Sequence, residues 1–112
     1  MNTMRQFKAD FFKALSHPLR IGILEVLSNG DCSVNEIQEQ LGSEGSAVSQ
    51  QLSILRSKNI VAGTKAGKRV VYTLRDPMVI NLLQVAREIF NNHLIDTITL
   101  LEELREEDSS LK

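Results

Sequence analysis

Small hydrogen-bonding side chains gather in the stretch SAVSQQLSILRSKNIV, residues 46–61. Apolar residues recur there at the spacing of one side of an amphipathic helix: Val48, Leu52 and Leu55. Ser46, Ser49 and Gln50 share another side of that helix, where Lys and Glu are the usual residues of a solvated surface. Short uncharged donors and acceptors suit a surface that closely approaches other hydrogen-bonding groups. Glutamine, for example, can pair with adenine at two atoms.

The charges of the chain are segregated, although the formal net charge is only −1. Between positions 56 and 75 every charged residue is basic: Arg56, Lys58, Lys65, Lys68, Arg69 and Arg75. From position 96 onward most charged residues are acidic: Asp96, Glu102, Glu103, Glu106, Glu107 and Asp108. Charge of one sign creates a local field even when the total is near zero. The alternative is that both charged segments are ordinary solvated surfaces. The uncharged helix face beside the basic segment instead favours the interpretation that the basic segment binds phosphate.

A helix-turn-helix is the element that would position this face. The motif SVNE at residues 33–36 is a capping box, which predicts the start of a helix, and Gly42 is a typical C-terminal stop. The next helix is expected to begin at Ser46 or a neighbour and to run to about Lys58, where Asn59 tolerates a left-handed exit. In such a unit the second helix enters the major groove of DNA with its N-terminal residues against base edges.

A basic β-hairpin is predicted directly after the helix-turn-helix. Two β-branched runs, residues 60–65 and 69–74, are separated by the turn residues Ala66-Gly67-Lys68. Cations on this hairpin would reach the DNA backbone or the minor groove beside the recognition helix and supply salt-dependent affinity: Lys65, Lys68 and Arg69.

Helical periodicity predicts two helices before the helix-turn-helix and one after the hairpin. The first covers residues 3–15, and Pro18 suits the first turn of the second, which ends at Asn29-Gly30. After Asp76-Pro77, apolar residues recur for about seven or eight turns without Pro or Gly, although Asn91-Asn92 could interrupt them. So long an apolar helix has more surface than a small domain can cover. We interpret it as a dimer interface, with a coiled coil as one form and a single core helix as the alternative.

The length of 112 residues corresponds to one domain, which alone can bury only a modest core. The sequence contains no run of about 18 apolar residues, so we expect no membrane-spanning helix. We also expect no secretion signal at the N-terminus. Cys32 is the single cysteine and cannot form an internal disulfide, so we expect a cytoplasmic protein. The elements together predict a mainly α (α+β) fold, a winged helix-turn-helix with one β-hairpin wing and a long C-terminal dimerisation helix.

Three segments of the chain resemble the ArsR/SmtB family of bacterial winged-helix repressors. KALSHPLRIGILEVL, residues 13–27, resembles the family's second-helix signature. SAVSQQLSILRSKNIV is similar to the recognition helix and its exit into the wing, and GTKAGKRVVYTL, residues 63–74, is similar to the wing. The resemblance covers about residues 5–93. Gly45 stands where many relatives have Gln, which removes one expected contact to DNA.

The resemblance implies a homodimer, joined by its first and last helices, that binds double-stranded DNA at an inverted-repeat operator. It implies repression of a linked operon, released by an inducer. It also implies a single winged-helix DNA-binding domain over residues 1–112, with dimerisation helices at 1–16 and 77–107, the helix-turn-helix at 33–58 and the wing at 60–75. The expected DNA-contacting residues are Ser46, Ala47, Ser49, Gln50, Arg56, Lys65, Lys68 and Arg69.

The positions at which relatives bind metal ions carry other residues here. Ser33 and Asn35 occupy the two cysteine positions of a Cys-Val-Cys pattern, and Cys32 lies one position away. Asp76 matches the zinc motif of the last helix, but the other positions of that motif carry Met78, Ile89 and Asn92. One thiolate and one carboxylate do not build a four-ligand zinc site, so we expect neither a metal nor a cofactor. His17 and His93 are interpreted as surface or capping residues.

A redox-responsive or metal-responsive repressor and a protein-binding winged helix are the alternatives. Cys32 could respond alone through an intersubunit disulfide or an oxidised thiol, although a small, partly buried, inert residue is the favoured interpretation. Winged helices can also bind protein, and the last helix could pair with a different partner. An enzyme is not expected, because the sequence has no Gly-rich phosphate loop, paired carboxylates or Cys/His constellation.

Overall fold

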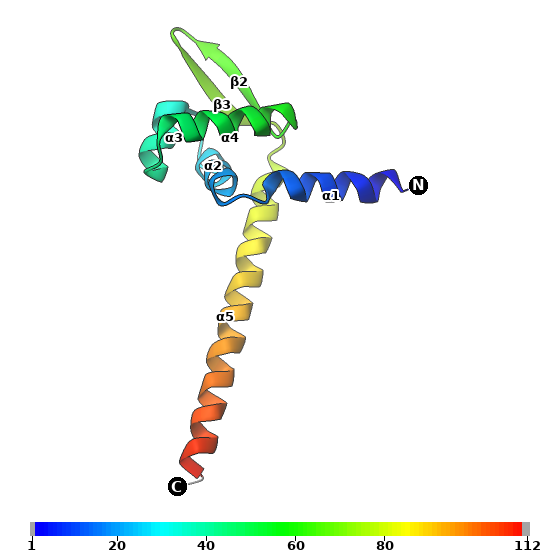
Figure 1. The fold of residues 1–112 in the computed structure, drawn as a ribbon, viewed down its shortest axis with the longest axis vertical. Helices are drawn as coiled ribbons and strands as arrows, with labels where there is room; N and C mark the ends of the chain where they lie inside the picture. Colours follow the sequence, from blue (N-terminus) through cyan, green and yellow to red (C-terminus); the bar gives the residue numbers. More distant parts are fainter. Residues whose placement is uncertain (1, 111–112) are drawn as a thin grey trace. The chain divides into compact units, whose positions relative to one another are not determined.

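The computed structural model describes residues 2–110 of the chain (Figure 1). Within these residues it has five helices and three strands, in the order α1 (Thr3–Leu15), α2 (Pro18–Ser28), β1 (Cys32–Ser33), α3 (Val34–Leu41), α4 (Gly45–Ser57), β2 (Val61–Ala66), β3 (Arg69–Leu74) and α5 (Met78–Ser110). The chain divides between Ile80 and Asn81 into two units. The predicted winged helix-turn-helix fold is confirmed, with the order of elements that the sequence indicates.

Three helices that pack against one another, α2, α3 and α4, form the centre of the N-terminal unit beside a small sheet (Figure 1). Their apolar sides and the first residue of β2 supply the fully buried side chains: Ile23, Leu24, Ile37, Val48, Leu52, Leu55 and Val61. Burying one side chain of this size stabilises the fold by about 1.5–3 kcal/mol. This core holds the two helices of the helix-turn-helix, α3 and α4, in a fixed arrangement.

Capping interactions define where the helices of this unit begin and end. His17 is the N-cap of α2, where its Nδ1 accepts a hydrogen bond at 3.1 Å from the backbone N–H two residues on, and Pro18 follows in the first turn. The predicted capping box of α3 is confirmed. The Ser33 hydroxyl accepts from the Glu36 N–H at 3.3 Å, and Glu36 Oε1 accepts from the Ser33 N–H at 3.1 Å. Gly42 ends α3, as predicted, and it does so in a left-handed conformation with φ of 66°.

The predicted hairpin is confirmed and forms the wing, β2 and β3. The two strands are joined by Gly67-Lys68, and Gly67 has φ of 68°, as the first residue of a type II′ turn requires. The antiparallel sheet has a third strand that the sequence did not predict, and its order is β1-β3-β2. β1 consists only of Cys32–Ser33, which is too short to show the alternation by which strands are found.

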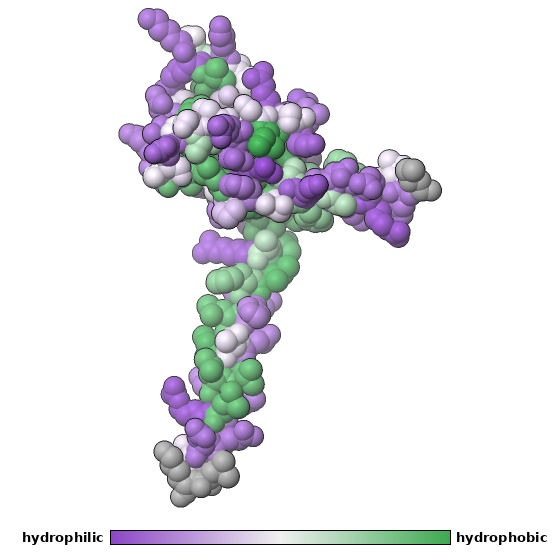
Figure 2. Space-filling model, in the orientation of Figure 1, coloured by the Kyte–Doolittle hydropathy of each residue, from purple (hydrophilic) through white to green (hydrophobic). Residues whose placement is uncertain are grey.

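The last helix, α5, is continuous over 33 residues. It runs through Asn91-Asn92 because an asparagine weakens a helix by only about 0.7 kcal/mol and keeps its backbone donor. Apolar side chains remain exposed along it (Figure 2), namely Val85, Ile89, Phe90, Leu94, Ile95, Ile98, Leu100, Leu101 and Leu104. No helix in the described part of the chain is long and apolar enough to cross a bilayer.

The first helix, α1, also keeps most of its apolar side chains in solvent. Ala14 and Leu15, at its end, are buried, but Phe7 is 62% exposed and its ring stacks on that of Phe11 with the centroids 5.9 Å apart. The single chain therefore leaves apolar surface on both helices that the resemblance assigns to the dimer interface.

Candidate nucleic-acid interface

The recognition helix α4 has two sharply different sides, as the sequence predicted. Val48, Leu52 and Leu55 have no exposed surface. Ser46, Ser49 and Gln50 lie on the other side and are exposed. The apolar side fixes the helix on the core, and the polar side is free to approach another molecule.

Ser53 is a fourth exposed polar residue on this side, and it was not among the residues selected from the sequence. It lies three and four positions after Gln50 and Ser49, so it shares their face of the helix. The same spacing rule could have identified it. Ala47 is half-buried at the edge of this face and presents only a methyl group. Ser57 is exposed in the last turn, but its hydroxyl donates to the Ile54 carbonyl at 2.7 Å.

The N-terminus of α4 presents backbone N–H groups rather than a capped end. Glu44 is the N-cap and makes no side-chain capping hydrogen bond. The first N–H groups of a helix have no partner within it and favour an anion such as phosphate. A Cβ at Gly45 would lie 2.8 Å from Gln38 Oε1, so glycine here leaves room for a side chain that comes from α3.

A Schellman motif joins the other end of α4 to the wing. Ile60 N–H donates to the Leu55 carbonyl and Asn59 N–H donates to the Arg56 carbonyl, both at 3.0 Å. Asn59 has φ of 59°, which confirms the left-handed exit predicted from the sequence. Ile60 and Leu55, the two positions at which this motif usually has apolar residues, are both buried. The motif thereby defines the path of the backbone between the end of the recognition helix and the first strand of the wing.

Arg20 links the recognition helix to the helices that precede it. Its Nε donates to Gln51 Oε1 at 2.8 Å, and its guanidinium also donates to the Ala14 carbonyl at 3.1 Å. Arg20 and Gln51 are both half-buried. This contact joins the end of α1, the start of α2 and the middle of α4, and it was not predicted from the sequence.

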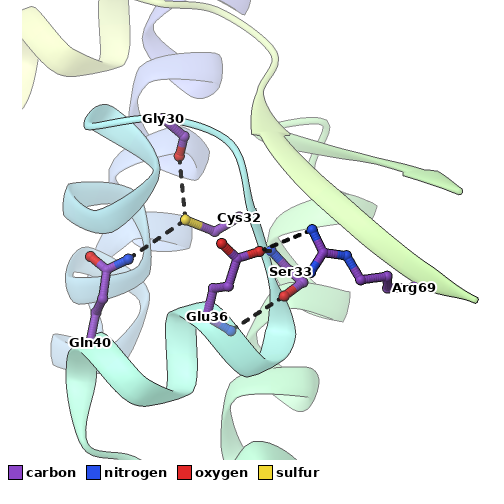
Figure 3. A network of polar contacts seen from close by, with 6 residues as sticks. All are labelled: Gly30, Cys32, Ser33, Glu36, Gln40 and Arg69. Carbon is purple, nitrogen blue, oxygen red and sulfur yellow. Dashed lines mark hydrogen bonds and ion pairs between the residues drawn. The ribbon is translucent and has the colours of Figure 1, made fainter. Parts of the chain in front are cut away.

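The predicted cations lie in two places. Lys65, Lys68 and Arg69 are exposed around the tip of the wing, and Arg56 is exposed in the last turn of α4, where the chain turns toward the base of the hairpin. Arg69 is already paired: its guanidinium lies 3.5 Å from Glu36 Oε1 (Figure 3).

Cys32 lies in the interior of this unit, with 7% of its surface exposed. The thiol donates to the Gly30 carbonyl at 3.6 Å, and the Gln40 amide donates to the sulfur at 3.8 Å (Figure 3). Burial raises the pKa of the Cys32 thiol, and the nearby charges of Glu36 and Asp31 raise it further, against the Gln40 hydrogen bond. Since the thiolate is the reactive form, this environment disfavours redox or metal chemistry. Among residues 2–110 no three His, Cys, Asp or Glu side chains are grouped so that they could hold a metal ion.

Known proteins share this arrangement and sequence. A family model described as "Bacterial regulatory protein, arsR family" matches residues 17–62. The HTH-type transcriptional regulator Rv0081 of Mycobacterium tuberculosis is 43% identical over 101 residues, which is 89% of each chain. The crystal structure of Rv0081 has a TM-score of 0.77 at 39% identity, and the match covers 88% of this chain and 99% of that one.

Two further relatives carry informative names. The biofilm growth-associated repressor of Xylella fastidiosa is 34% identical over 82 residues, which cover 73% of this chain and 72% of the repressor. The homodimeric winged helix-turn-helix DNA-binding domain of Mb0332 from Mycobacterium bovis has a TM-score of 0.72 at 26% identity, over 81% of this chain and 84% of that one. Members of this family are transcriptional regulators and not enzymes. The chain therefore belongs to the ArsR family of bacterial regulatory proteins and is a DNA-binding transcriptional regulator.

Proposed function

We propose that the chain is a homodimeric repressor that binds an inverted-repeat operator in double-stranded DNA and controls a linked operon until an inducer releases it. The observation that carries the proposal is the two-sided character of α4. One side is completely buried, and the other exposes the uncharged polar side chains of Ser46, Ser49, Gln50 and Ser53 beside a basic wing. The name of the Xylella fastidiosa relative, a biofilm growth-associated repressor, supports repression rather than activation.

In the proposed complex the N-terminal half of α4 lies in the major groove. Ser46, Ala47, Ser49 and Gln50 face base edges or the nearest phosphates, and Ser53 extends this set. The cations contact phosphates, which supplies affinity that does not depend on sequence: Arg56, Lys65, Lys68 and Arg69. Specificity then comes from few groups, of which Gln50 has the longest reach.

The second copy of the chain covers the exposed apolar side chains of α1 and α5. Phe7 of α1 and Leu94 and Leu101 of α5 are each about half exposed or more in the single chain, with exposed fractions of 62%, 47% and 58%. A two-fold dimer reads two half-sites about 10 base pairs apart, related by the same symmetry. Because its partner is bacterial DNA, we place the protein in the cytoplasm.

The inducer acts without the chemistry of a reactive cysteine. Cys32 is buried and its pKa is raised, so neither the redox alternative nor the metal alternative gains support from its surroundings. A protein-binding winged helix is also less favoured, because the basic wing next to an uncharged recognition face is complementary to DNA rather than to a typical protein surface.

Fluorescence anisotropy with DNA from upstream of the protein's own gene tests this proposal. The control is a scrambled duplex of equal length and composition at about 150 mM salt, where sequence-independent binding is weak. The proposal expects one dimer per site and at least about a thousandfold preference for the upstream DNA. Equal affinity for both duplexes would exclude an operator in that region.

A further inference from the structure

One of the wing cations, Arg69, has a partner of opposite charge within its own chain. Its guanidinium lies 3.5 Å from Oε1 of Glu36, and the ion pair connects the first turn of α3 to β3 (Figure 3). The pair is solvent-accessible, with side-chain exposures of 63% for Arg69 and 44% for Glu36. A solvent-accessible ion pair of this kind contributes little to the free energy of folding. We therefore consider how Glu36 changes the binding of other groups by Arg69.

The Glu36 carboxylate is held in place by more than Arg69. The same Oε1 accepts a hydrogen bond from the Ser33 N–H at 3.1 Å. Ser33 belongs to β1, and in the pairing of β1 with β3 it lies opposite Val71. The pKa of Glu36 lies below its usual range, first because of the hydrogen bond from the Ser33 backbone, then because of the Ser33 side chain and, to a smaller extent, because of Arg69. The carboxylate therefore stays ionised at neutral pH and cannot swing away without breaking the capping box.

The geometry leaves Arg69 able to bind a phosphate while Glu36 remains beside it. A guanidinium has five N–H donors in a planar fork, and the single 3.5 Å approach to Glu36 is not a bidentate pair. A phosphate that binds the remaining donors would then lie near a fixed negative charge. Repulsion between the carboxylate and the phosphate offsets part of the attraction of the arginine.

We propose that Glu36 acts as a fixed negative charge that weakens the attraction of Arg69 for the DNA backbone and so restrains binding to duplexes of every sequence. Glu36 would thereby limit non-specific binding by the wing, in addition to capping α3. The inference rests on the proposed function in one respect, namely that Arg69 contacts phosphate. The opposite role, in which Glu36 orients Arg69 and increases affinity, predicts a change of the opposite sign.

Glu36→Gln separates the charge from the cap, because glutamine serves the third position of a capping box as glutamate does. We expect this variant to bind a random-sequence duplex about two- to fivefold more tightly than wild type at about 50 mM salt. The gain should shrink toward about 200 mM salt, so the salt dependence of the variant is steeper. The matched control is Glu39→Gln, which removes one formal charge from an exposed side chain about one turn further along α3.

The same pair of measurements in an Arg69→Ala background tests whether the effect acts through the arginine. We expect the gain from Glu36→Gln to disappear there, with thermal unfolding of all variants confirming that they fold. Weaker binding by Glu36→Gln, an equal gain from Glu39→Gln, or an equal gain without Arg69 would each overturn the inference. Wild type that binds no duplex at about 50 mM salt would instead overturn the proposed function, and this inference with it.

Discussion

Arg20 and Gln51 form a hydrogen bond of 2.8 Å, from Nε to Oε1, between two helices whose residues lie 31 positions apart. The same guanidinium donates to the Ala14 carbonyl at the end of α1. Together with the buried apolar side of α4, we expect this contact to restrain the rotation of the helix about its axis, and so the direction in which Ser49 and Gln50 point. Arg20 thereby links the end of α1, a proposed dimer element, to the recognition helix.

Arg20→Ala should destabilise the protein and weaken operator binding. The change leaves the half-buried Gln51 amide and the Ala14 carbonyl without their donor, which costs about 1–3 kcal/mol. Urea unfolding measures the first effect, and anisotropy on the operator measures the second. Arg20→Lys is the control, since lysine keeps the charge but lacks the planar fork that reaches both acceptors. Wild-type affinity for the alanine variant would show that the contact does not position α4.

Gln50→Ala should lower affinity for the operator and leave affinity for random DNA nearly unchanged. If the amide reads a base, its loss costs about 1–3 kcal/mol, roughly 5- to 150-fold in the dissociation constant. Competition between labelled operator and random duplex gives both affinities in one experiment. The matched control is Gln84→Ala, which removes an exposed glutamine amide from α5, outside the recognition helix. An equal loss on both duplexes would make Gln50 a phosphate contact or a structural residue.

Lys68→Ala at the wing tip, unlike Gln50→Ala, should weaken binding to operator and random DNA alike. Because a phosphate contact carries no sequence information, affinity for all duplexes should fall by a similar factor. The slope of log affinity against log salt should become less negative by about 0.9. A titration over several salt concentrations checks this, with Lys58→Ala, at the C-cap of α4, as the comparison. An unchanged slope would remove Lys68 from the interface.

Leu101→Asp should convert the dimer to a monomer without unfolding the N-terminal unit. Leu101 is 58% exposed in the single chain, so the carboxylate disturbs only what a second copy covers. Sedimentation velocity should show the monomer, and operator affinity should fall at least about tenfold because the two half-sites are no longer linked. Thr99→Asp places the same charge on another side of α5 and should leave the dimer intact. A dimeric Leu101→Asp variant would show that this part of α5 does not lie in the interface.

Cys32 should make the protein less stable as the pH rises. Its pKa is raised in the folded state, so the unfolded chain ionises first, near pH 8.5, and stability falls from there until the folded pKa is reached. Urea unfolding of wild type and Cys32→Ala between about pH 7 and 10 measures the difference. The curve of the variant should lack this decline. Labelling of the native thiol at the rate of the unfolded chain would contradict the protected environment described here.

The sequence was sufficient to predict features that depend only on residues close to one another along the chain. Pro18, the capping box at Ser33 and Glu36, and the left-handed positions Gly42 and Asn59 define helix ends through interactions within a few residues. The side of α4 that is buried also follows from spacing alone. These features need no knowledge of distant parts of the chain.

The features that escaped prediction depend on residues far apart in the sequence. β1 exists because β3 offers it a partner, and two residues alone show no strand pattern. The bond between Arg20 and Gln51 and the ion pair between Glu36 and Arg69 require helices and strands to be packed first. Both of these contacts involve polar side chains that, from the sequence alone, would be expected to face solvent.

Selection from a random duplex library is the most direct test of the central claim, that a two-fold dimer reads DNA through α4. The purified protein is incubated with the library at about 150 mM salt, and bound duplexes are sequenced over successive rounds. The account predicts an enriched inverted repeat with half-sites about 10 base pairs apart, which is lost in Leu101→Asp and altered at one position of each half-site in Gln50→Ala. Bound duplexes as diverse as the starting library, or an enriched single half-site without symmetry, would contradict it.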